Sequence, residues 1–176
     1  VFVAPHGRSP SGLPDVIRRW QSRGIRLIED AAQALGSYSD NRHLGTIGDC
    51  GCLSFSSQKI VTTGQGGAVV TSDDQINATM RLLRDFGRTA GGTDHYLRVG
   101  WNLKFTDLQA VIGIEQFRRL PALIEQKRKL FAWYVELLDG VQEVALLPTD
   151  LTQVTPWFVD VLVDGLLVGL DGKEAI

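Results

Sequence analysis

The sequence predicts an α/β protein in which helices flank a β-sheet, and two observations support this fold class. A strand pattern, a helical pattern and a second strand pattern follow one another along the first part of the chain, with short connections. This order is typical of a parallel crossover unit. The chain of 176 residues is also long enough for one domain with a substantial core.

The elements of the crossover unit can be assigned in order. We expect residues 1–5 to form a buried strand and the stretch 7–14, rich in Gly, Ser and Pro, to form a loop. A helix over residues 14–23 begins with a proline, which suits a first helical turn, and its apolar residues share one face. A glycine ends this helix, and Ile25–Glu29 is the second strand.

The rest of the chain continues to alternate strands and helices. Residues 37–49 are polar and contain glycine, so we expect a loop there. Further on we expect two strands, a helix capped by Ser72 or Asp73, a long polar stretch that is mobile or ordered by a partner, a helical stretch interrupted by Pro121, and a last strand. In order, these elements cover residues 50–55, 68–71, 73–86, 87–100, 106–138 and 157–163.

Composition and charge narrow the functional classes. Hydrophobic residues make up 44% of the chain and charged residues 22%, which is ordinary for a soluble globular protein. The formal net charge of -2 gives no electrostatic reason to expect nucleic acid or an anionic membrane as a partner. The sequence has no apolar run of transmembrane length and no basic-then-apolar leader.

The two cysteines and the chain ends support further expectations. Cys50 and Cys52 are two positions apart in a strand-like run, where neighbours rarely bridge, so we predict reduced thiols in a cytoplasmic protein. A Cys-x-Cys metal pair would lack a second pair, so small core residues are the favoured interpretation and no metal site is expected. The chain begins without methionine inside a strand pattern, and residues 171–176 resemble a helix that begins and stops. We expect an internal fragment of a longer protein.

Lys59 is the most informative residue, because it lies between an apolar strand pattern and the glycine-rich turn Gly64–Gly67. Partial desolvation there would favour the neutral, nucleophilic amine. A lysine at a strand end more often simply reaches water. Here, however, Ser54, Thr62 and Thr63 are small hydroxyl donors suited to phosphate oxygens, and the glycines allow the backbone to approach a ligand.

Asp30 follows the second predicted strand, at the carboxyl end where open α/β sheets bind their ligands. Its simplest role is to cap the segment that follows. With Lys59 in the same chain and Gln33 three residues further on, a ring-binding role is favoured. An amine that forms a Schiff base and a carboxylate that keeps a ring nitrogen protonated are the two groups that pyridoxal phosphate chemistry needs.

The glycine-rich turn matches no common nucleotide-binding motif. The Gly-Lys-Ser/Thr order of the Walker loop is absent, and a strand rather than a helix follows the turn. The glycine spacing of the dinucleotide fingerprint is absent as well. A phosphate- or nucleotide-binding module built on this turn therefore remains the least favoured hypothesis. Asn102 is a further candidate, although its segment can be explained as a loop before a helix capped by Thr106 or Asp107.

Several motifs in the same order resemble the DegT/DnrJ/EryC1/StrS family of sugar aminotransferases, which have the type I fold of aspartate aminotransferase. The resemblance spans nearly the whole chain, and its linked motifs make chance an unlikely explanation. The motifs are Glu29-Asp30-Ala31-Ala32-Gln33-Ala34, Gly45-Thr46-Ile47-Gly48-Asp49, Ser54-Phe55 through Lys59, Thr62-Thr63-Gly64-Gln65-Gly66-Gly67-Ala68-Val69-Val70, and Trp101-Asn102 to Gly113.

The resemblance implies a role for each candidate residue. Lys59 matches the lysine that binds pyridoxal 5'-phosphate as a Schiff base and then moves the proton. Asp30 matches the carboxylate on the pyridine nitrogen, Gln33 the side chain near the ring hydroxyl, and Ser54 a phosphate ligand. Asn102 matches an asparagine that reaches the phosphate of the neighbouring subunit, which implies a homodimer with shared active sites. Relatives typically move an amino group from glutamate to a keto sugar on a nucleotide carrier.

The resemblance also has departures and implies a domain division. Lys104 stands where many relatives have arginine, and Trp101 where many have tyrosine. The family's N-terminal phosphate segment and its ring-stacking aromatic would precede Val1. Relatives with histidine in place of the lysine perform dehydration, and Lys59 argues against that branch. We expect residues 1–140 to form the large cofactor-binding domain without its N-terminal part, and residues 141–176 to form the connection and the start of the small C-terminal domain.

The leading hypothesis is therefore the catalytic core of a pyridoxal-phosphate sugar aminotransferase. A non-catalytic remnant that keeps the fold but binds no cofactor is the alternative, because the ring-stacking and phosphate segments are missing. We also expect the fragment to expose apolar surface and to dimerise poorly.

Overall fold

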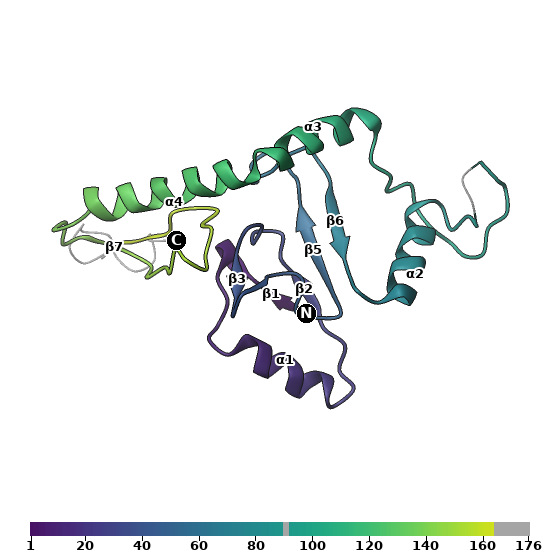
Figure 1. Cartoon of the computed structure of the whole chain (residues 1–176), viewed down its shortest axis with the longest axis horizontal. Helices are drawn as coiled ribbons and strands as arrows, with labels where there is room; N and C mark the ends of the chain where they lie inside the picture. The colour runs from purple at the N-terminus through teal and green to yellow at the C-terminus, as the bar shows by residue number, and fades with distance from the viewer. Residues whose placement is uncertain (90–91, 164–176) are drawn as a thin grey trace.

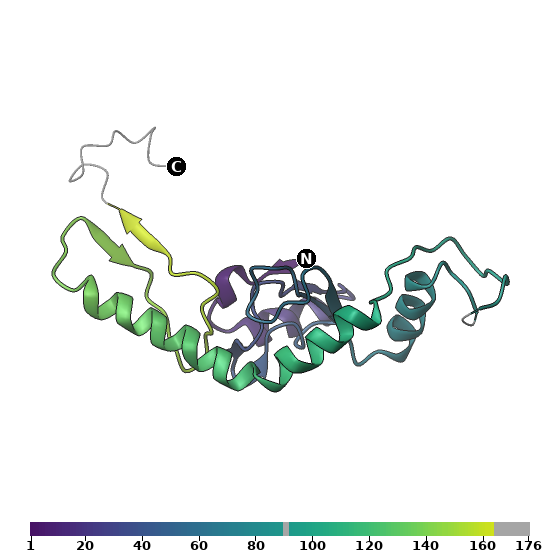
Figure 2. The same ribbon diagram turned by 90° about the horizontal axis from the view of Figure 1, so that it is seen from above.

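The computed structural model describes residues 1–89 and 92–163. The molecule is elongated, with a central sheet, a long pair of helices running past it and an arm beyond the sheet at each end (Figures 1 and 2). The helix start expected at residues 171–176 lies outside the described residues. Within them, no helix is long and apolar enough to cross a membrane.

The central sheet has four strands and confirms the predicted crossover unit. Its strands are β1 (Phe2–Val3), β2 (Ile28–Asp30), β5 (Cys50–Ser54) and β6 (Gly67–Val70), in the order β1-β2-β5-β6. The first three are mutually parallel, and β6 is antiparallel to β5. Because Asp30 pairs with Cys52 in register, β2 and β5 end close together at the same edge of the sheet.

The main core forms where helix α1 (Leu13–Gln21) packs on the sheet. Leu13 and Ile17 are buried on the inner face of α1, as a period of 3.6 residues requires. They pack with small and branched residues from the segments next to β1 and β2 and from the stretch between β2 and β5. These are Ala4, Leu27, Ala31, Ala34, Leu44 and Ile47.

Two predictions about this first unit are corrected. The opening strand is not buried: Val1 is 85% and Val3 53% exposed, because β1 is an edge strand that pairs only with β2. The second strand begins at Ile28 rather than at Ile25. The Ile25 N–H donates to the carbonyl of Trp20 and Gly24 has a φ of 72°, so these residues close the end of α1.

Residues 37–49, expected to be a loop, contain a small antiparallel hairpin. It pairs β3 (Tyr38–Ser39) with β4 (Arg42–His43). Asp40 and Asn41 form the turn with φ values of 47° and 62°, which suits these residue types. A short 3-10 helix, η1 (Pro5–Gly7), follows β1 and brings His6 to the carboxyl edge of the sheet.

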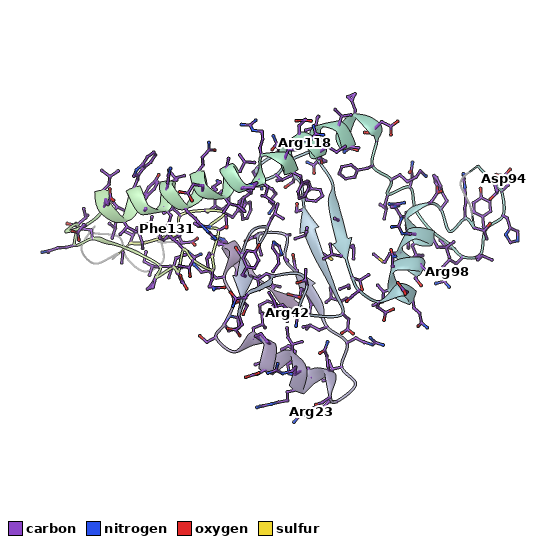
Figure 3. All side chains as sticks on the ribbon, in the orientation of Figure 1. Arg23, Arg42, Asp94, Arg98, Arg118 and Phe131 are labelled. Carbon is purple, nitrogen blue, oxygen red and sulfur yellow. The ribbon has the colours of Figure 1, made fainter. Side chains whose placement is uncertain are left out.

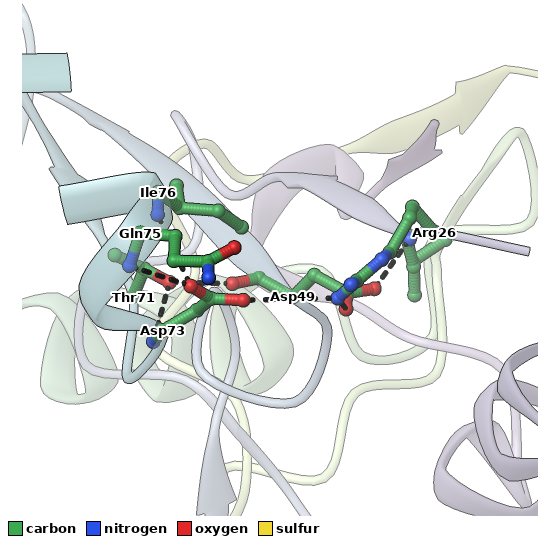
Figure 4. Close-up of polar contacts among 7 residues, drawn as sticks. Arg26, Asp49, Thr71, Asp73, Gln75 and Ile76 are labelled. Carbon is green, nitrogen blue, oxygen red and sulfur yellow. Dashed lines mark hydrogen bonds and ion pairs between the residues drawn. The ribbon is translucent and has the colours of Figure 1, made fainter. Parts of the chain in front are cut away.

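Helix α2 (Asp74–Arg84) begins where the sequence predicted and ends two residues earlier than expected. The Asp73 carboxylate caps it by accepting from the N–H groups of Gln75 and Ile76. Nearby, the Asp49 carboxylate accepts from Arg26 and from the backbone N–H of Leu27 (Figure 4). The bonds of Asp49 join the loop between β2 and β5 to the segment before β2, and Arg26 also lies 3.8 Å from the Asp73 carboxylate at the start of α2.

The long helical stretch is two helices, α3 (Asp107–Arg118) and α4 (Leu120–Leu137), with the break at Arg119 just before Pro121. Thr106 and Gln109 form a capping box at the start of α3. α4 runs away from the sheet, and Phe131 is buried on it (Figures 2 and 3).

The C-terminal part differs from the prediction in its strands. A hairpin pairs β7 (Val144–Leu146), which the sequence analysis did not predict, with β8 (Val161–Val163). The strand expected over residues 157–163 is therefore limited to its last three residues. Trp157 lies outside the strand because its side chain is buried against the loop that follows β5.

Candidate active site

The candidate residues gather where parallel strands of the central sheet end. Asp30 is the last residue of β2 and Ser54 is the last residue of β5. Lys59 lies in the loop that follows β5, and Gln33 lies just after β2. Because β2 and β5 are parallel neighbours, these residues all follow the same edge of the sheet.

The loop that carries Lys59 is held closed at its base. The Phe55 N–H donates to the carbonyl of Gly66 at 2.8 Å, and the Thr63 N–H donates to the carbonyl of Phe55 at 3.0 Å. The Lys59 N–H donates to the carbonyl of Ser56 at 3.0 Å, which forms a turn just before the lysine. Phe55 is buried, so the loop is anchored in the protein and Lys59 has a defined position at its tip.

Burial and a nearby carboxylate act in opposite directions on the Lys59 amine. Burial lowers the pKa of Lys59, because desolvation disfavours the ammonium, and the charge of Asp30 raises this pKa. Burial is the larger effect, so the pKa lies below its ordinary value. Lys59 and Asp30 are therefore close enough to interact electrostatically, yet within residues 1–89 and 92–163 they form no ion pair.

Asp30 and Gln33 present hydrogen-bonding groups at the same edge. Asp30 Oδ1 accepts from the N–H of Ala32 at 3.1 Å, a local bond that fixes the carboxylate after the strand. Gln33 Oε1 accepts from the N–H of His6 at 2.8 Å. The Gln33 side-chain oxygen therefore links the loop after β2 to η1. The Gln33 amide nitrogen is the group that could donate to a ligand.

The hydroxyl groups differ from the prediction. Thr62 Oγ1 donates to the carbonyl of Phe55 at 3.3 Å, and Thr63 Oγ1 donates to the carbonyl of Gln65 at 2.7 Å. These two threonine hydroxyls stabilise their own loop by donating to its carbonyl groups. Ser54 Oγ has two long contacts of 3.4 Å each: it donates to Ser56 Oγ and accepts from the Ser56 N–H. Of the three predicted hydroxyl donors, Ser54 is the one least engaged by the protein.

Asn102 lies apart from the other candidates within this chain. It forms an antiparallel bridge with Asp85 at the end of α2, in the arm that extends beyond β6 (Figure 1). Lys104 Nζ contacts Asp85 Oδ1 at 2.5 Å and lowers the pKa of that carboxyl. Figure 3 shows Asp94 and Arg98 further out on the same arm. Asn102 is exposed there, so the structure does not bring it to Lys59.

Trp157 is a site residue that the sequence analysis missed. Lys59 Nζ lies over the indole of Trp157, 3.5 Å from the ring centroid. The indole Nε1–H donates to the carbonyl of Gln58 at 2.9 Å, which attaches the ring to the lysine loop. The two residues of this bond are 99 positions apart. No local sequence pattern indicates such a contact. The only signal in the sequence is the adjacent aromatic pair Trp157–Phe158, which is apolar enough to be buried.

The residues present fit pyridoxal phosphate by the chemistry of their groups. Three groups lie at the same edge of the sheet. Lys59 has an amine whose pKa is lowered by burial, Asp30 has a carboxylate without an ion-pair partner among the described residues, and Gln33 has an amide donor. A Schiff base needs the first, and a protonated pyridine nitrogen needs the second.

Comparison with known proteins now identifies the family. The sequence model of the DegT/DnrJ/EryC1/StrS aminotransferase family matches residues 9–165. The chain belongs to this family. Among curated members, it is 37% identical over 124 residues to the GDP-perosamine synthase of Caulobacter vibrioides. It is 36% identical over 133 residues to the UDP-N-acetyl-3-dehydro-alpha-D-glucosamine 3-aminotransferase of Acidithiobacillus ferrooxidans.

A solved structure of an aminotransferase confirms the predicted fold class. The chain matches the aminotransferase TlmJ from Streptoalloteichus hindustanus with a TM-score of 0.84 and 29% identity. The match covers 93% of this chain and 45% of that chain. The alignments to the two curated relatives cover 70% and 75% of this chain, but only 33% and 36% of the relatives. The chain thus spans about a third to under half of the length of these relatives.

Proposed function

We propose that this protein is a pyridoxal-phosphate-dependent aminotransferase that acts on a nucleotide-linked keto sugar, with glutamate as the amino donor. The observation that carries the proposal is Lys59. Its amine is partly desolvated and feels the charge of Asp30 at the carboxyl edge of the sheet. Membership of an aminotransferase family supports the same chemistry.

Each candidate residue has one role in this proposal. When bound, pyridoxal phosphate supplies an electron sink that stabilises negative charge on the substrate carbon. Lys59 holds the cofactor and then moves a proton at its Nζ atom. Asp30 keeps a ring nitrogen protonated, Gln33 donates to the ring hydroxyl through its amide, and Ser54 binds the phosphate. Asn102 reaches the phosphate of a second copy, so the working protein is a homodimer.

The substrate class is inferred from the relatives. One relative is a GDP-perosamine synthase, and another is an aminotransferase for a UDP-linked dehydro sugar. Both names specify a nucleotide-linked sugar, although the nucleotides differ. We therefore propose a nucleotide sugar as the substrate and leave the base, the sugar and the carbon position open.

The test is the absorbance of the protein with its cofactor. Pyridoxal phosphate is added to the purified chain, and we expect a visible band that the Lys59→Ala variant abolishes. Lys129→Ala is the matched control, because Lys129 lies on α4 in an exposed pair with Glu125 and should leave the band unchanged. If the unaltered chain gives no band, or if Lys59→Ala keeps it, the proposal fails. Absence of the band in every variant would favour the non-catalytic alternative.

A further inference from the structure

An aromatic platform lies beneath the Lys59 amine. Lys59 Nζ is 3.5 Å from the centroid of the Trp157 indole, and Trp157 is only 7% exposed. At this distance the positive charge interacts with the negative face of the ring. Because the indole is buried, water screens this interaction little. The contact therefore stabilises the ammonium against the cost of its partial burial.

The indole is fixed from several directions. Its Nε1–H donates to the carbonyl of Gln58, the residue before the lysine. His6 packs its ring edge-on against the indole, with centroids 5.9 Å apart and planes at 80°. Phe158 stacks on it at 4.1 Å, and Lys127 Nζ donates to the Trp157 carbonyl at 3.3 Å. The ring therefore cannot turn away from Lys59 without breaking its contacts with Gln58, His6 and Phe158, and the Lys127 bond holds the backbone of Trp157.

The support behind the indole connects to the rest of the candidate site. The His6 N–H donates to Gln33 Oε1, and the His6 ring contacts Asp160 with Nδ1 2.5 Å from the carboxylate. Asp160 also pairs with Arg8, which donates to Thr149 at 2.9 Å. A continuous set of contacts thus runs from Gln33 through His6 to the ring under the lysine.

We propose that Trp157 is a positioning residue for Lys59, whose ammonium it holds on its indole face. Without the indole, burial would still lower the pKa of Lys59 and only the charge of Asp30 would oppose it, so the amine would lose its proton more readily. Among the described residues, the other charged or titratable groups around Trp157 are Lys127 on α4 and the His6–Asp160 pair behind the indole. The catalytic meaning of this contact rests on the role proposed for Lys59.

The experiment measures the Lys59 pKa in the purified chain without cofactor. Each variant is pulsed with a small amine-acylating reagent at a series of pH values, and the labelled Lys59 peptide is quantified by mass spectrometry. Only the unprotonated amine reacts, so the midpoint reports the pKa. Trp157→Leu keeps an apolar side chain but removes the ring, and we expect the pKa of Lys59 to fall by about 0.4–1.5 units. Trp157→Phe should give a smaller fall.

Matched controls separate the contact from general damage. Trp133→Leu makes the same change at an exposed position on α4, and it should leave the Lys59 midpoint unchanged. Lys129 serves as an internal reference whose midpoint should not move in any variant. If Trp157→Leu does not fold, the Trp157→Phe variant decides the matter. An unchanged or raised Lys59 midpoint in a folded Trp157 variant would overturn the proposal.

This outcome is independent of the absorbance test for the cofactor. A shifted Lys59 midpoint without a visible band would support the positioning role and reject the aminotransferase proposal for this chain. A band with no shift of the midpoint would do the reverse.

Discussion

Glu29 and Asp30 are neighbours on β2 with opposite environments. Successive residues of a strand point to opposite faces, so two adjacent carboxylates can be separated completely. Glu29 is 1% exposed and accepts from the N–H groups of Gly45, Ile47 and Gly48. Asp30 is turned to the candidate site, where its charge affects Lys59. The first carboxylate shapes the loop before β5, and the second belongs to the chemistry that we propose.

Glu29→Gln should destabilise the fold strongly for an isosteric change. The Glu29 carboxylate accepts hydrogen bonds from three backbone N–H groups, and the variant replaces it with a neutral amide. A hydrogen bond to a charged group contributes about 1.5–3 kcal/mol. We expect the free energy of unfolding in urea to fall by about this amount. Glu125→Gln, on the exposed part of α4, is the matched control and should change it little. Equal effects of the two substitutions would contradict this role for Glu29.

Asp49 makes the fold sensitive to acid. Hydrogen bonds from Leu27 N–H and from Arg26 lower the pKa of Asp49. A carboxyl whose pKa is lowered by folding stabilises the protein above its unfolded pKa of about 4, and this contribution is lost as the pH falls through the folded value. The difference in unfolding free energy between the unaltered chain and Asp49→Asn should therefore be largest near neutral pH and shrink in acid. A difference that stays constant from neutral pH to pH 3 would exclude this effect.

Short loops and strands approach each other closely next to the candidate site. A Cβ atom on Gly51, in the middle of β5, would lie 2.0 Å from the carbonyl oxygen of Gly45. Backbone atoms cannot move aside without a large cost. The loop around Gly45, which Glu29 holds, and strand β5 can therefore pack this closely only if residue 51 is glycine. Because β5 leads into the loop that carries Lys59, the position of that loop depends on the packing of Gly51 against Gly45.

Gly51→Ala should consequently disturb both stability and the site. Overpacking against backbone costs about 1–3 kcal/mol, and occasionally more. We expect the midpoint of urea unfolding to fall, with Cys50→Ala on the same strand as a milder control. If Gly51→Ala matched Cys50→Ala in stability, the loop and the strand would not be packed as the structure shows.

Local signals account for the elements that the sequence predicted well. Asp73 and Thr106 begin α2 and α3 by caps that their neighbours in sequence complete, and the break before Pro121 follows from the proline itself. The predicted ends of the corresponding strands, Glu29 and Phe55, each lie one residue from the observed ends of β2 and β5, Asp30 and Ser54. These signals lie within a few residues of the feature they specify.

Long-range contacts account for what the sequence could not predict. The exposure of β1 depends on its place at the sheet edge, which no residue of the strand encodes. The pairing of β7 with β8 and the contact of Trp157 with Lys59 each join segments that are distant along the chain. The engaged hydroxyls of Thr62 and Thr63 depend on the detailed path of their loop.

The elongated molecule exposes much apolar surface, as the sequence analysis expected. On α3, Leu108 is 71% and Val111 63% exposed, and Val99 and Leu103 on the preceding segment are 81% and 66% exposed. Figures 1 and 2 show that this segment and α3 lie along the outside of the molecule. Contiguous apolar surface on a soluble protein marks an interaction site or an aggregation liability.

We predict that the isolated chain forms oligomers of several sizes instead of a single well-defined dimer. Sedimentation velocity should show a broad, concentration-dependent distribution, which the double substitution Leu108→Lys and Val111→Lys should narrow toward monomer. The corresponding control, Leu130→Lys and Tyr134→Lys on α4, should narrow it less, since those residues are only 39% and 41% exposed. A single sharp dimer boundary for the unaltered chain would refute the prediction.

The central claim is that Lys59, and no other lysine, binds pyridoxal phosphate beside Asp30. The most direct measurement treats the chain with the cofactor, reduces the product with borohydride and maps the modified lysine by peptide mass spectrometry. We expect the modification on Lys59, and we expect Asp30→Ala to decrease it. Modification spread over the exposed lysines, such as Lys104 and Lys129, with Lys59 unmodified, would contradict the account.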